Sequence, residues 1–393
     1  MAAISWNILT PEYPPQSGGV SDYARQLSRA LRRAGDRATV WAPACAEQAL
    51  PEDGVEIERR ADLFTPKGLA WLGEQLQKRP GILLVQYVPS GFGYRAMNVR
   101  FARWLRRRPE RLWMMFHEVA YPVGWRVPPA QSVRGLVNRW MARQLLRRAE
   151  RAFVSTTAWS AQVEALWRGK GKAVELPVPS NLPLDAEPAA VMEARSRHRG
   201  DADVLLGSFG TYGPLVAPLL ERALRELLEA GPKRRALLVG RGSAAFSRRF
   251  AATAPALARR VIATGELAPE ASAAHLAACH VLLQPFPDGV TTRRTSLMAG
   301  LALGKPVVTN AGALTEAVWK ERGGVALAPS PQELAPAAEA LLRQPERWSE
   351  LGERGRALYR ERFSLQGVVE TLRISASSSP STGAPPTAPG SAR

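Results

Sequence analysis

The sequence is poor in cysteine and in long apolar runs, and each shortage excludes a class of protein. Cys45 and Cys279 are its two cysteines, too few and too far apart for a secreted domain held by disulfides. No stretch reaches the roughly 18 apolar residues of a membrane-spanning helix. No basic segment followed by an apolar core opens the chain, so we expect no secretion signal. We expect a cytoplasmic protein, for which peripheral contact with the inner face of a membrane is one option.

Acidic residues are also scarce relative to basic ones, and the net charge is +18. Part of this positive charge is weak evidence for an acidic partner. Only seven of the 53 basic residues are lysines, and a coding bias towards arginine could account for part of the arginine excess. The stretch from Arg95 to Lys172, however, holds 17 basic residues and 4 acidic ones. This concentration predicts a basic surface for an acidic partner such as phosphate, a membrane surface or nucleic acid.

Short apolar runs alternate with longer amphipathic stretches, the pattern of parallel strands joined by crossover helices. The predicted strands are Ile4–Leu9, Ala38–Trp41, Ile82–Gln86, Leu112–Phe116, Ala152–Val154 and Ala173–Leu176 in the first half, and Val204–Phe209, Ala236–Val239, Val261–Ala263, Val281–Leu283 and Pro306–Thr309 in the second. A polar, proline-punctuated segment, 176–203, separates the halves and indicates an interdomain connection with a short helix. The last residues are rich in Ser, Pro, Gly and Ala, so we expect a disordered tail over 375–393.

The stretch "PPQSGGVSDYARQL" follows the first predicted strand and opens a helix. Gly18 and Gly19 give the backbone freedom at this turn, and a helix start leaves N–H groups free that can hold an anion. An ordinary strand-to-helix turn explains the same residues. A second candidate, His117, follows the apolar strand "LWMMF", where it could donate a hydrogen bond to a substrate hydroxyl or phosphate.

The segment from Gln284 to Trp319 holds the largest number of candidate ligand-binding residues. We expect a helix from about Thr292, which would place Arg293 and Arg294 in its first turn, where the helix dipole disfavours cations. A bound anion would restore the balance; the alternative is that Asp288 and solvent offset the arginines.

Glycine turns follow two further strands. Arg241 lies between Gly240 and Gly242 and could meet a phosphate or a base. Gly210 belongs to a G-x-x-G-x-x-G spacing, which is not the dinucleotide fingerprint, so a nicotinamide cofactor is poorly supported. Asp201 and Asp203 precede their strand and thus lie at the wrong sheet edge for a metal-diphosphate site, and no metal site is expected.

In their order along the chain, several of these segments resemble family 4 glycosyltransferases of the GT-B architecture. They are "PEYPPQSGGVSDYARQLSRALRRAGDRATVWAP", "HEVAYP", "LLGSFGTYGPL", "LLVGRGS", "TGELAPE", "GLALGKPVVTNAGALTEAV" and "PERWSELGERGRALYRERFSLQGVVETL". The resemblance implies an α/β protein with two Rossmann-like domains facing a cleft that binds a nucleotide sugar. It further implies an acceptor domain over 1–180, completed by a closing helix at about 362–374, and a donor domain over 181–361.

The chain departs from the family at two glutamates eight positions apart, which would fall at Thr291 and Ala299 when Gly304 is aligned. The segment instead resembles a divergent branch with a D-G-x-x-x-R-R element. In that branch Asp288 would contact the donor sugar. The resemblance assigns the donor nucleotide and its diphosphate to backbone and side chains of Gly18, Gly19, Gly210, Thr211, Arg241, Gly289, Val290, Thr291, Arg293 and Arg294.

The resemblance implies sugar transfer from a nucleoside-diphosphate sugar, most simply a UDP-sugar, with retention of configuration and without a metal. His117 would steady the sugar or the leaving phosphate. The acceptor would be a small molecule, a glycan or a lipid-linked compound, and no nucleic acid partner is expected. The competing hypothesis is a non-catalytic GT-B scaffold that binds an acidic partner through its basic first domain.

One helix in the basic stretch bears on the lipid-linked acceptor. Leu136, Trp140, Leu145 and Ala149 recur there at roughly helical spacing among arginines. Such a stripe is typical of a helix that rests on an anionic membrane, but a crossover helix needs the same stripe to pack on its sheet.

Overall fold

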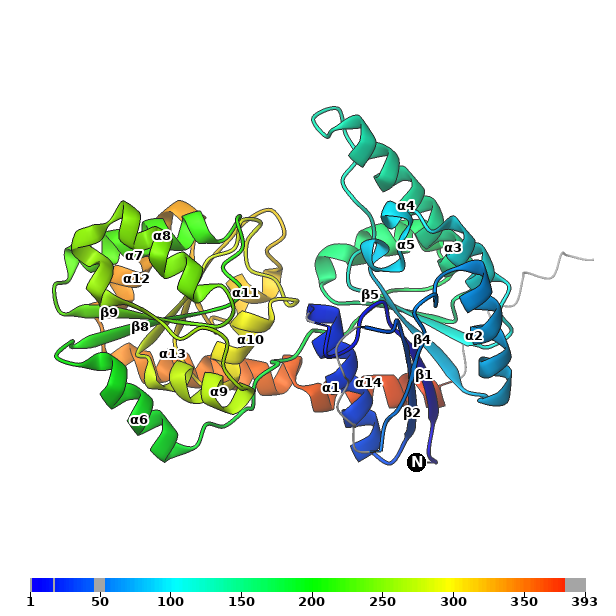
Figure 1. Ribbon diagram of the computed structural model, residues 1–393, viewed down its shortest axis with the longest axis horizontal. Coiled ribbons are helices and arrows are strands. Elements are labelled where there is room, and N and C mark those ends of the chain that lie inside the picture. Colours follow the sequence, from blue (N-terminus) through cyan, green and yellow to red (C-terminus); the bar gives the residue numbers. More distant parts are fainter. Residues whose placement is uncertain (1, 17, 46–53, 379–393) are drawn as a thin grey trace, which may run out of the picture.

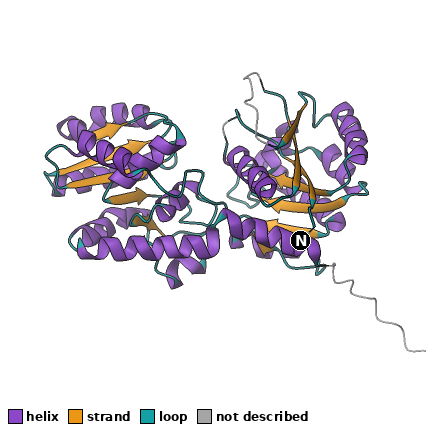
Figure 2. Cartoon of the chain, turned by 90° about the horizontal axis from the view of Figure 1, so that it is seen from below, coloured by secondary structure: helices purple, strands orange, loops and turns teal. Residues whose placement is uncertain are grey.

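Two parallel β-sheets, each covered by helices on both faces, form two domains in the computed structural model, which describes residues 2–16, 18–45 and 54–378 (Figures 1 and 2). The first sheet has seven strands in the order β3-β2-β1-β4-β5-β6-β7, and the second has six in the order β10-β9-β8-β11-β12-β13. The predicted α/β architecture with two Rossmann-like domains is therefore confirmed.

The first domain contains the N-terminal elements and the last helix of the chain. Its strands are β1 (Ser5–Leu9), β2 (Arg37–Ala42), β3 (Glu56–Arg59), β4 (Ile82–Tyr87), β5 (Arg111–Phe116), β6 (Arg151–Val154) and β7 (Val174–Glu175). Its α-helices are α1 (Gly19–Arg33), α2 (Pro66–Lys78), α3 (Val99–Arg106), α4 (Pro129–Arg148), α5 (Ser160–Trp167) and α14 (Leu365–Ser377). The edge strand β3 was not predicted, because charged residues alternate with its one isoleucine.

The second domain repeats the alternation of strands and helices. Its strands are β8 (Val204–Phe209), β9 (Arg234–Val239), β10 (Val261–Ala263), β11 (Val281–Gln284), β12 (Val307–Asn310) and β13 (Ala326–Ala328). Its α-helices are α6 (Pro188–Arg199), α7 (Ala217–Ala230), α8 (Ser243–Thr253), α9 (Pro269–Ala278), α10 (Thr295–Ala302), α11 (Ala317–Glu321), α12 (Leu334–Leu342) and α13 (Glu346–Leu358). The edge strand β13 also escaped prediction, because two of its three residues are alanines, which are depleted in strands.

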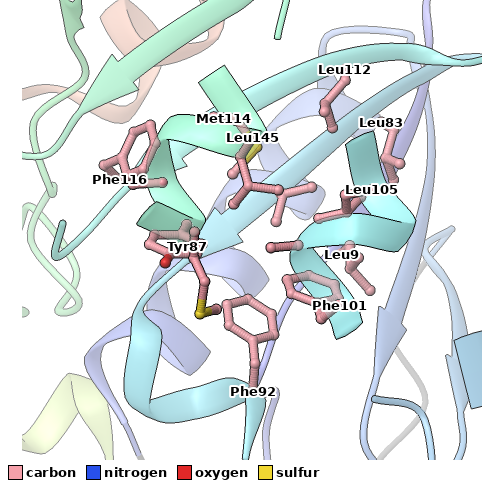
Figure 3. Close-up of a cluster of buried hydrophobic side chains, with 14 of the residues drawn as sticks. Leu9, Leu83, Tyr87, Phe92, Phe101, Leu105, Leu112, Met114, Phe116 and Leu145 are labelled. Carbon is pink, nitrogen blue, oxygen red and sulfur yellow. The ribbon is translucent and has the colours of Figure 1, made fainter. Parts of the chain in front are cut away.

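Each sheet is buried on both faces, as its continuous apolar strands require. On β4, Leu83, Val85 and Tyr87 point to one face and pack against side chains of α3 and α4 (Figure 3). Ile82 and Leu84 point to the other face, in the cluster that includes α1 and α14. Side chains alternate along a strand, so one strand serves both cores.

The chain crosses between the domains twice. It leaves the first domain after β7, and it returns through a π-helical turn, Tyr359–Phe363, that leads into α14. In Figure 1 these last helices (orange) run from the second domain back beneath the first. Arg373 of α14 donates to the Asp36 carboxylate at 2.7 Å, which ties the helix to the turn before β2. Within the described ranges, no helix is both long and apolar enough to cross a bilayer.

The structure bears on only some of the predicted segment limits. The boundaries after residue 180 and before residue 362 stay predictions. Residues 375–377 belong to α14 and are helical, so the prediction that disorder begins at residue 375 is wrong. The rest of the predicted tail, residues 379–393, lies outside the described residues.

The carboxyl ends of the two sheets meet at the domain interface. Thr292, which follows β11, donates its hydroxyl hydrogen bond to the carbonyl of Ser155, which follows β6, at 3.1 Å. Open parallel sheets bind ligands at this edge, where strand order reverses. Here the order reverses between β1 and β4 and between β8 and β11, so a ligand site is expected on both sides of the interface.

Candidate functional site

The helix that follows β11 begins later than predicted. The helix α10 begins at Thr295, and Arg294 is its N-cap residue with φ −87° and ψ 90°. Arg293 and Arg294 therefore precede the first turn, and the prediction that they lie inside it is wrong. The cause is tertiary, because the Glu316 carboxylate accepts from both the N–H and the hydroxyl of Thr292, each at 2.7 Å, and so fixes this residue in the loop.

Asp288 brings both arginines of this loop together. Arg293 donates to one carboxylate oxygen of Asp288 at 3.3 Å, and Arg294 donates to the other. Burial lowers the pKa of Arg294, and its guanidinium lies 4.7 Å from the centre of the Phe286 ring. Asp288 thus balances part of the charge, as the simpler alternative required. Two guanidinium groups on one carboxylate nevertheless leave a net positive loop.

Arg293 also reaches across the interface to the first domain. Its guanidinium lies 3.7 Å from the carboxylate of Glu118 and 5.8 Å from the centre of the Trp159 ring. Glu118 follows His117, so the arginine pair and the predicted histidine lie on facing sides of one site. The two domains therefore bring together residues that are far apart in the sequence.

His117 is buried at the end of β5, next to this arginine. Burial, with a smaller effect from the positive charge of Arg293, lowers the pKa of His117 to about 3. The ring is therefore neutral at physiological pH. Its Nε2 lies 2.8 Å from Oε1 of Gln86, an oxygen that can only accept. With the Gln86 amide in this orientation, Nε2 carries the proton, and Nδ1 is the ring atom that can accept a hydrogen bond from a ligand.

Helix α1 starts differently from the prediction. The N–H groups of Val20 and Ser21, which were expected to be free for an anion, both donate to the carboxylate of Glu12 at 3.1 Å. Gly18 lies against this carboxylate with no room for a Cβ, whereas Gly19 faces open space. The expectation of free amides is therefore wrong for the structure as it stands, because the loop before the helix supplies its own anion.

The start of α1 nevertheless faces the second domain. Asp22 in its first turn accepts a hydrogen bond from Asn181 at 3.2 Å. Burial raises the pKa of Asp22, and the nearby charge of Arg241 opposes the shift. Tyr23 of the same turn packs its ring edge-on to His117, 5.0 Å away. Helix α1 therefore connects the histidine with the loop that carries Arg241.

The glycine loops after β8 and β9 lie against each other. A side chain at Gly240, where φ is +111°, would collide with the carbonyl of Gly210, and one at Gly242 would collide with that of Thr211. Arg241 is exposed and lies 3.5 Å from the carboxylate of Glu266. These loops form a second group of predicted residues at the same sheet edge.

Val290 and Thr291 are buried, so their side chains do not form the open face of the loop. The Val290 N–H donates to the carbonyl of Asn310 at 2.9 Å and is not free for a phosphate. The Thr291 hydroxyl, in contrast, has no hydrogen-bond partner within the described part of the chain. A buried hydroxyl in this position suits a ligand oxygen.

Glu316, which the sequence analysis missed, is the most highly bonded side chain of the site. It follows β12 and is buried. Its carboxylate accepts from the hydroxyl of Thr156 at 2.5 Å and from the Thr157 N–H at 3.2 Å, both in the first domain. It also accepts from the N–H and the hydroxyl of Thr292, each at 2.7 Å, and from the Trp319 indole at 2.9 Å. The one sequence feature that could have indicated Glu316 is its place between a predicted strand and a short helix.

Comparison with known proteins agrees with this geometry. Residues 18–179 match the model of the glycosyl transferase 4-like domain, and residues 207–344 match that of the glycosyl transferases group 1. The chain belongs to the family 4 glycosyltransferases of the GT-B fold. A search of curated protein sequences gives no match for this glycosyltransferase.

Solved structures share the fold of this glycosyltransferase. Sucrose-phosphate synthase from Thermosynechococcus elongatus is 20% identical, with a TM-score of 0.71 over 94% of this chain and 98% of the other. HepE from Anabaena in complex with UDP-glucose is 18% identical, with a TM-score of 0.67 over 95% and 99%. Trehalose-6-phosphate from E. coli bound with UDP-2-fluoro glucose is 10% identical, with a TM-score of 0.65 over 96% and 100%.

The buried bonds of Glu316 predict a large loss of stability in Glu316→Ala. We expect the free energy of unfolding to fall by about 3 kcal/mol, because buried donors from both domains lose a charged acceptor. Glu321→Ala, on the exposed side of the same helix α11, is the matched control and should change little. Urea denaturation compares the two; equal stability of both variants would contradict the role given to Glu316.

Proposed function

We propose that this glycosyltransferase moves a sugar from a UDP-sugar to an acceptor hydroxyl with retention of anomeric configuration. The observation that carries the proposal is the loop of Asp288, Arg293 and Arg294, which faces His117 across the domain interface. Three further points support it: the family, the UDP ligands of HepE and of the E. coli protein, and the first turn of α10, which has no side-chain cap.

In the proposed reaction the bond between the sugar C1 and the phosphate oxygen breaks, and a bond from C1 to the acceptor oxygen forms on the same face. The leaving phosphate oxygen takes the acceptor proton, and UDP departs. Negative charge grows on the diphosphate as it leaves. Arg293 and Arg294 would stabilise that charge together with the amides at the start of α10. This positive charge lets the proposal work without a metal.

His117 and Asp288 would place the sugar. The neutral ring of His117 would form a hydrogen bond with a sugar hydroxyl through Nδ1. Asp288 would accept from another sugar hydroxyl while it holds the two arginines. Gly210, Thr211 and Arg241 would meet the nucleotide, and the turn at Gly18 and Gly19 would face the diphosphate or the acceptor.

The acceptor would be a small molecule, a glycan or a lipid-linked compound. The lipid-linked class would require peripheral contact with the inner face of a membrane. Because Thr291 and Ala299 stand where the family commonly has two glutamates, ribose binding must rest on other groups. The competing hypothesis, a non-catalytic scaffold for an acidic partner, predicts binding of such a partner without turnover.

Incubation of the protein with UDP-, GDP- and dTDP-sugars tests the proposal. We expect UDP release from at least one UDP-sugar, by transfer or by slow hydrolysis. Proton NMR of the product should show the anomeric configuration of the donor. Arg248→Ala, an exposed change on α8, is the active control, and Asp288→Asn should be impaired. Tight UDP binding without release from any sugar nucleotide would favour the scaffold, and inversion would contradict retention.

A further inference from the structure

The start of α4 and the loop before it carry an exposed apolar surface, which we call the α4 tip (residues 121–140). Five large apolar side chains are exposed on it: Val123, Trp125, Val133, Leu136 and Trp140. Trp125 is 87% exposed and Leu136 is 57% exposed. In Figure 1 this end of α4 projects beyond the rest of the first domain. Apolar side chains gathered on a projection indicate an interaction site.

The stripe predicted from the sequence divides between two faces of α4. Leu145 is fully buried in the core, whereas Leu136 and Trp140 face outward. Val133, Leu136 and Trp140 follow one another at helical spacing and so share a face. Val123 lies against the same helix beside Gly135. Packing on the sheet therefore accounts for the second half of the stripe and leaves the first half unexplained.

Arginines flank the α4 tip and complement an anionic partner. The guanidinium of Arg126 lies 4.3 Å from the centre of the Trp125 ring. The guanidinium of Arg103 lies 5.7 Å from the centre of the Trp140 ring. Arg103 also lines a groove of about 500 Å³ between α2 and α3, together with three other arginines and Trp104. Among these arginines, Arg100, Arg103 and Arg107 are exposed. Within the described residues these three have no ion-pair partner, so their charge is directed to solvent.

We propose that the α4 tip binds the surface of an anionic lipid bilayer. Its apolar side chains would enter the boundary between headgroups and acyl chains, and the neighbouring arginines would face the lipid phosphates. Aliphatic side chains favour a bilayer over nucleic acid, which offers stacking and phosphate contacts but no apolar layer. Tryptophans with arginines beside them suit the interface, where one end of the ring is apolar and the other is wet.

The position of the tip in the chain links it to the site. His117 opens the connection from β5 to α4, and Trp125 lies near the far end of the same connection. A membrane-bound tip would hold this side of the interface near the bilayer, where a lipid-linked acceptor is found. That last step rests on the proposed function, but binding of the tip to lipid does not.

Co-sedimentation of the full chain with vesicles tests the proposal without any sugar nucleotide. Vesicles of phosphatidylcholine alone are compared with vesicles that also contain phosphatidylglycerol, at low and at high salt. We expect binding to the anionic vesicles at low salt and release as salt rises. Trp125→Ser with Leu136→Ser should weaken binding at least about tenfold. Arg103→Gln and Arg126→Gln should each weaken it about fivefold.

Matched changes in the second domain serve as controls. Leu215→Ser, at a 73% exposed leucine, and Arg248→Gln should leave vesicle binding unchanged. No sedimentation with strongly anionic vesicles at low salt would overturn the proposal, as would equal losses in the tip variants and the controls. Binding of a DNA duplex that the tip variants abolish, without vesicle binding, would assign the surface to nucleic acid instead. Vesicle binding by a chain that transfers no sugar would leave this proposal standing and refute the proposed function.

Discussion

His117→Ala should lower kcat about a hundredfold, while the KM for the donor changes much less. The ring lies beside Arg293 and, in the proposed reaction, holds the sugar as the phosphate leaves. A group whose hydrogen bond matters most while charge develops acts mainly on kcat. Steady-state kinetics with the UDP-sugar that the wild type uses measures the effect. His275→Ala, at a half-buried histidine of α9, is the matched control and should retain the kcat of the wild type.

The pH dependence separates this role from a packing role. The pKa of His117 is about 3 in the folded protein and about 6.5 in an unfolded chain. Protonation therefore favours unfolding, and this part of the stability is lost as pH falls from about 6.5 towards 3. His117→Gln should lose less stability over that range than the wild type, yet remain catalytically impaired. A variant that is active but merely unstable would show that His117 is a core residue.

Arg293→Ala and Arg294→Ala should each weaken UDP binding by about 1–3 kcal/mol, the scale of a lost charge-assisted hydrogen bond. Both guanidinium groups lie in the loop before α10, where their shared partner Asp288 offsets one of their two positive charges and the Glu118 carboxylate lies 3.7 Å from Arg293. Calorimetric titration of UDP gives the affinities. Arg248→Ala in the same domain should bind UDP as the wild type does.

Asp288→Asn distinguishes a ligand site from a simple ion-pair cluster. If the arginines bind diphosphate, neutralising Asp288 should leave UDP binding equal or tighter and still lower kcat, because the sugar loses an acceptor. If the arginines serve only to pair with Asp288, the arginine variants will lose stability without losing UDP affinity. That second result would contradict the assignment.

Strands that bury both faces were predictable, because their sequences are continuous apolar runs. The strand Val204–Phe209, in the interior of the second sheet, has the predicted limits. The edge strand Glu56–Arg59 was not predictable in this way, since its charged side chains give no apolar run. Such strands exist because a neighbouring strand supplies hydrogen bonds, which the local sequence does not record.

The residues predicted for the candidate site come together in the structure, but the sequence did not indicate how they are bonded. The D-G-x-x-x-R-R element pointed to the loop with Asp288, and the strand end pointed to His117. The hydrogen bonds of the Glu12 and Glu316 carboxylates could not be predicted, because they form only after folding brings their donors close. Glu316 lies 24 residues from Thr292 and 160 from Thr156. A single sequence gives no sign that such distant residues share one carboxylate.

The structure of the protein in complex with UDP tests the central claim most directly, namely that a nucleotide sugar binds between the two domains. The account predicts the diphosphate within hydrogen-bond distance of Arg293 or Arg294 and the start of α10, with the nucleoside towards Gly210 and Arg241. UDP bound elsewhere, or absent at saturating concentration while the arginines still hold Asp288 alone, would contradict it.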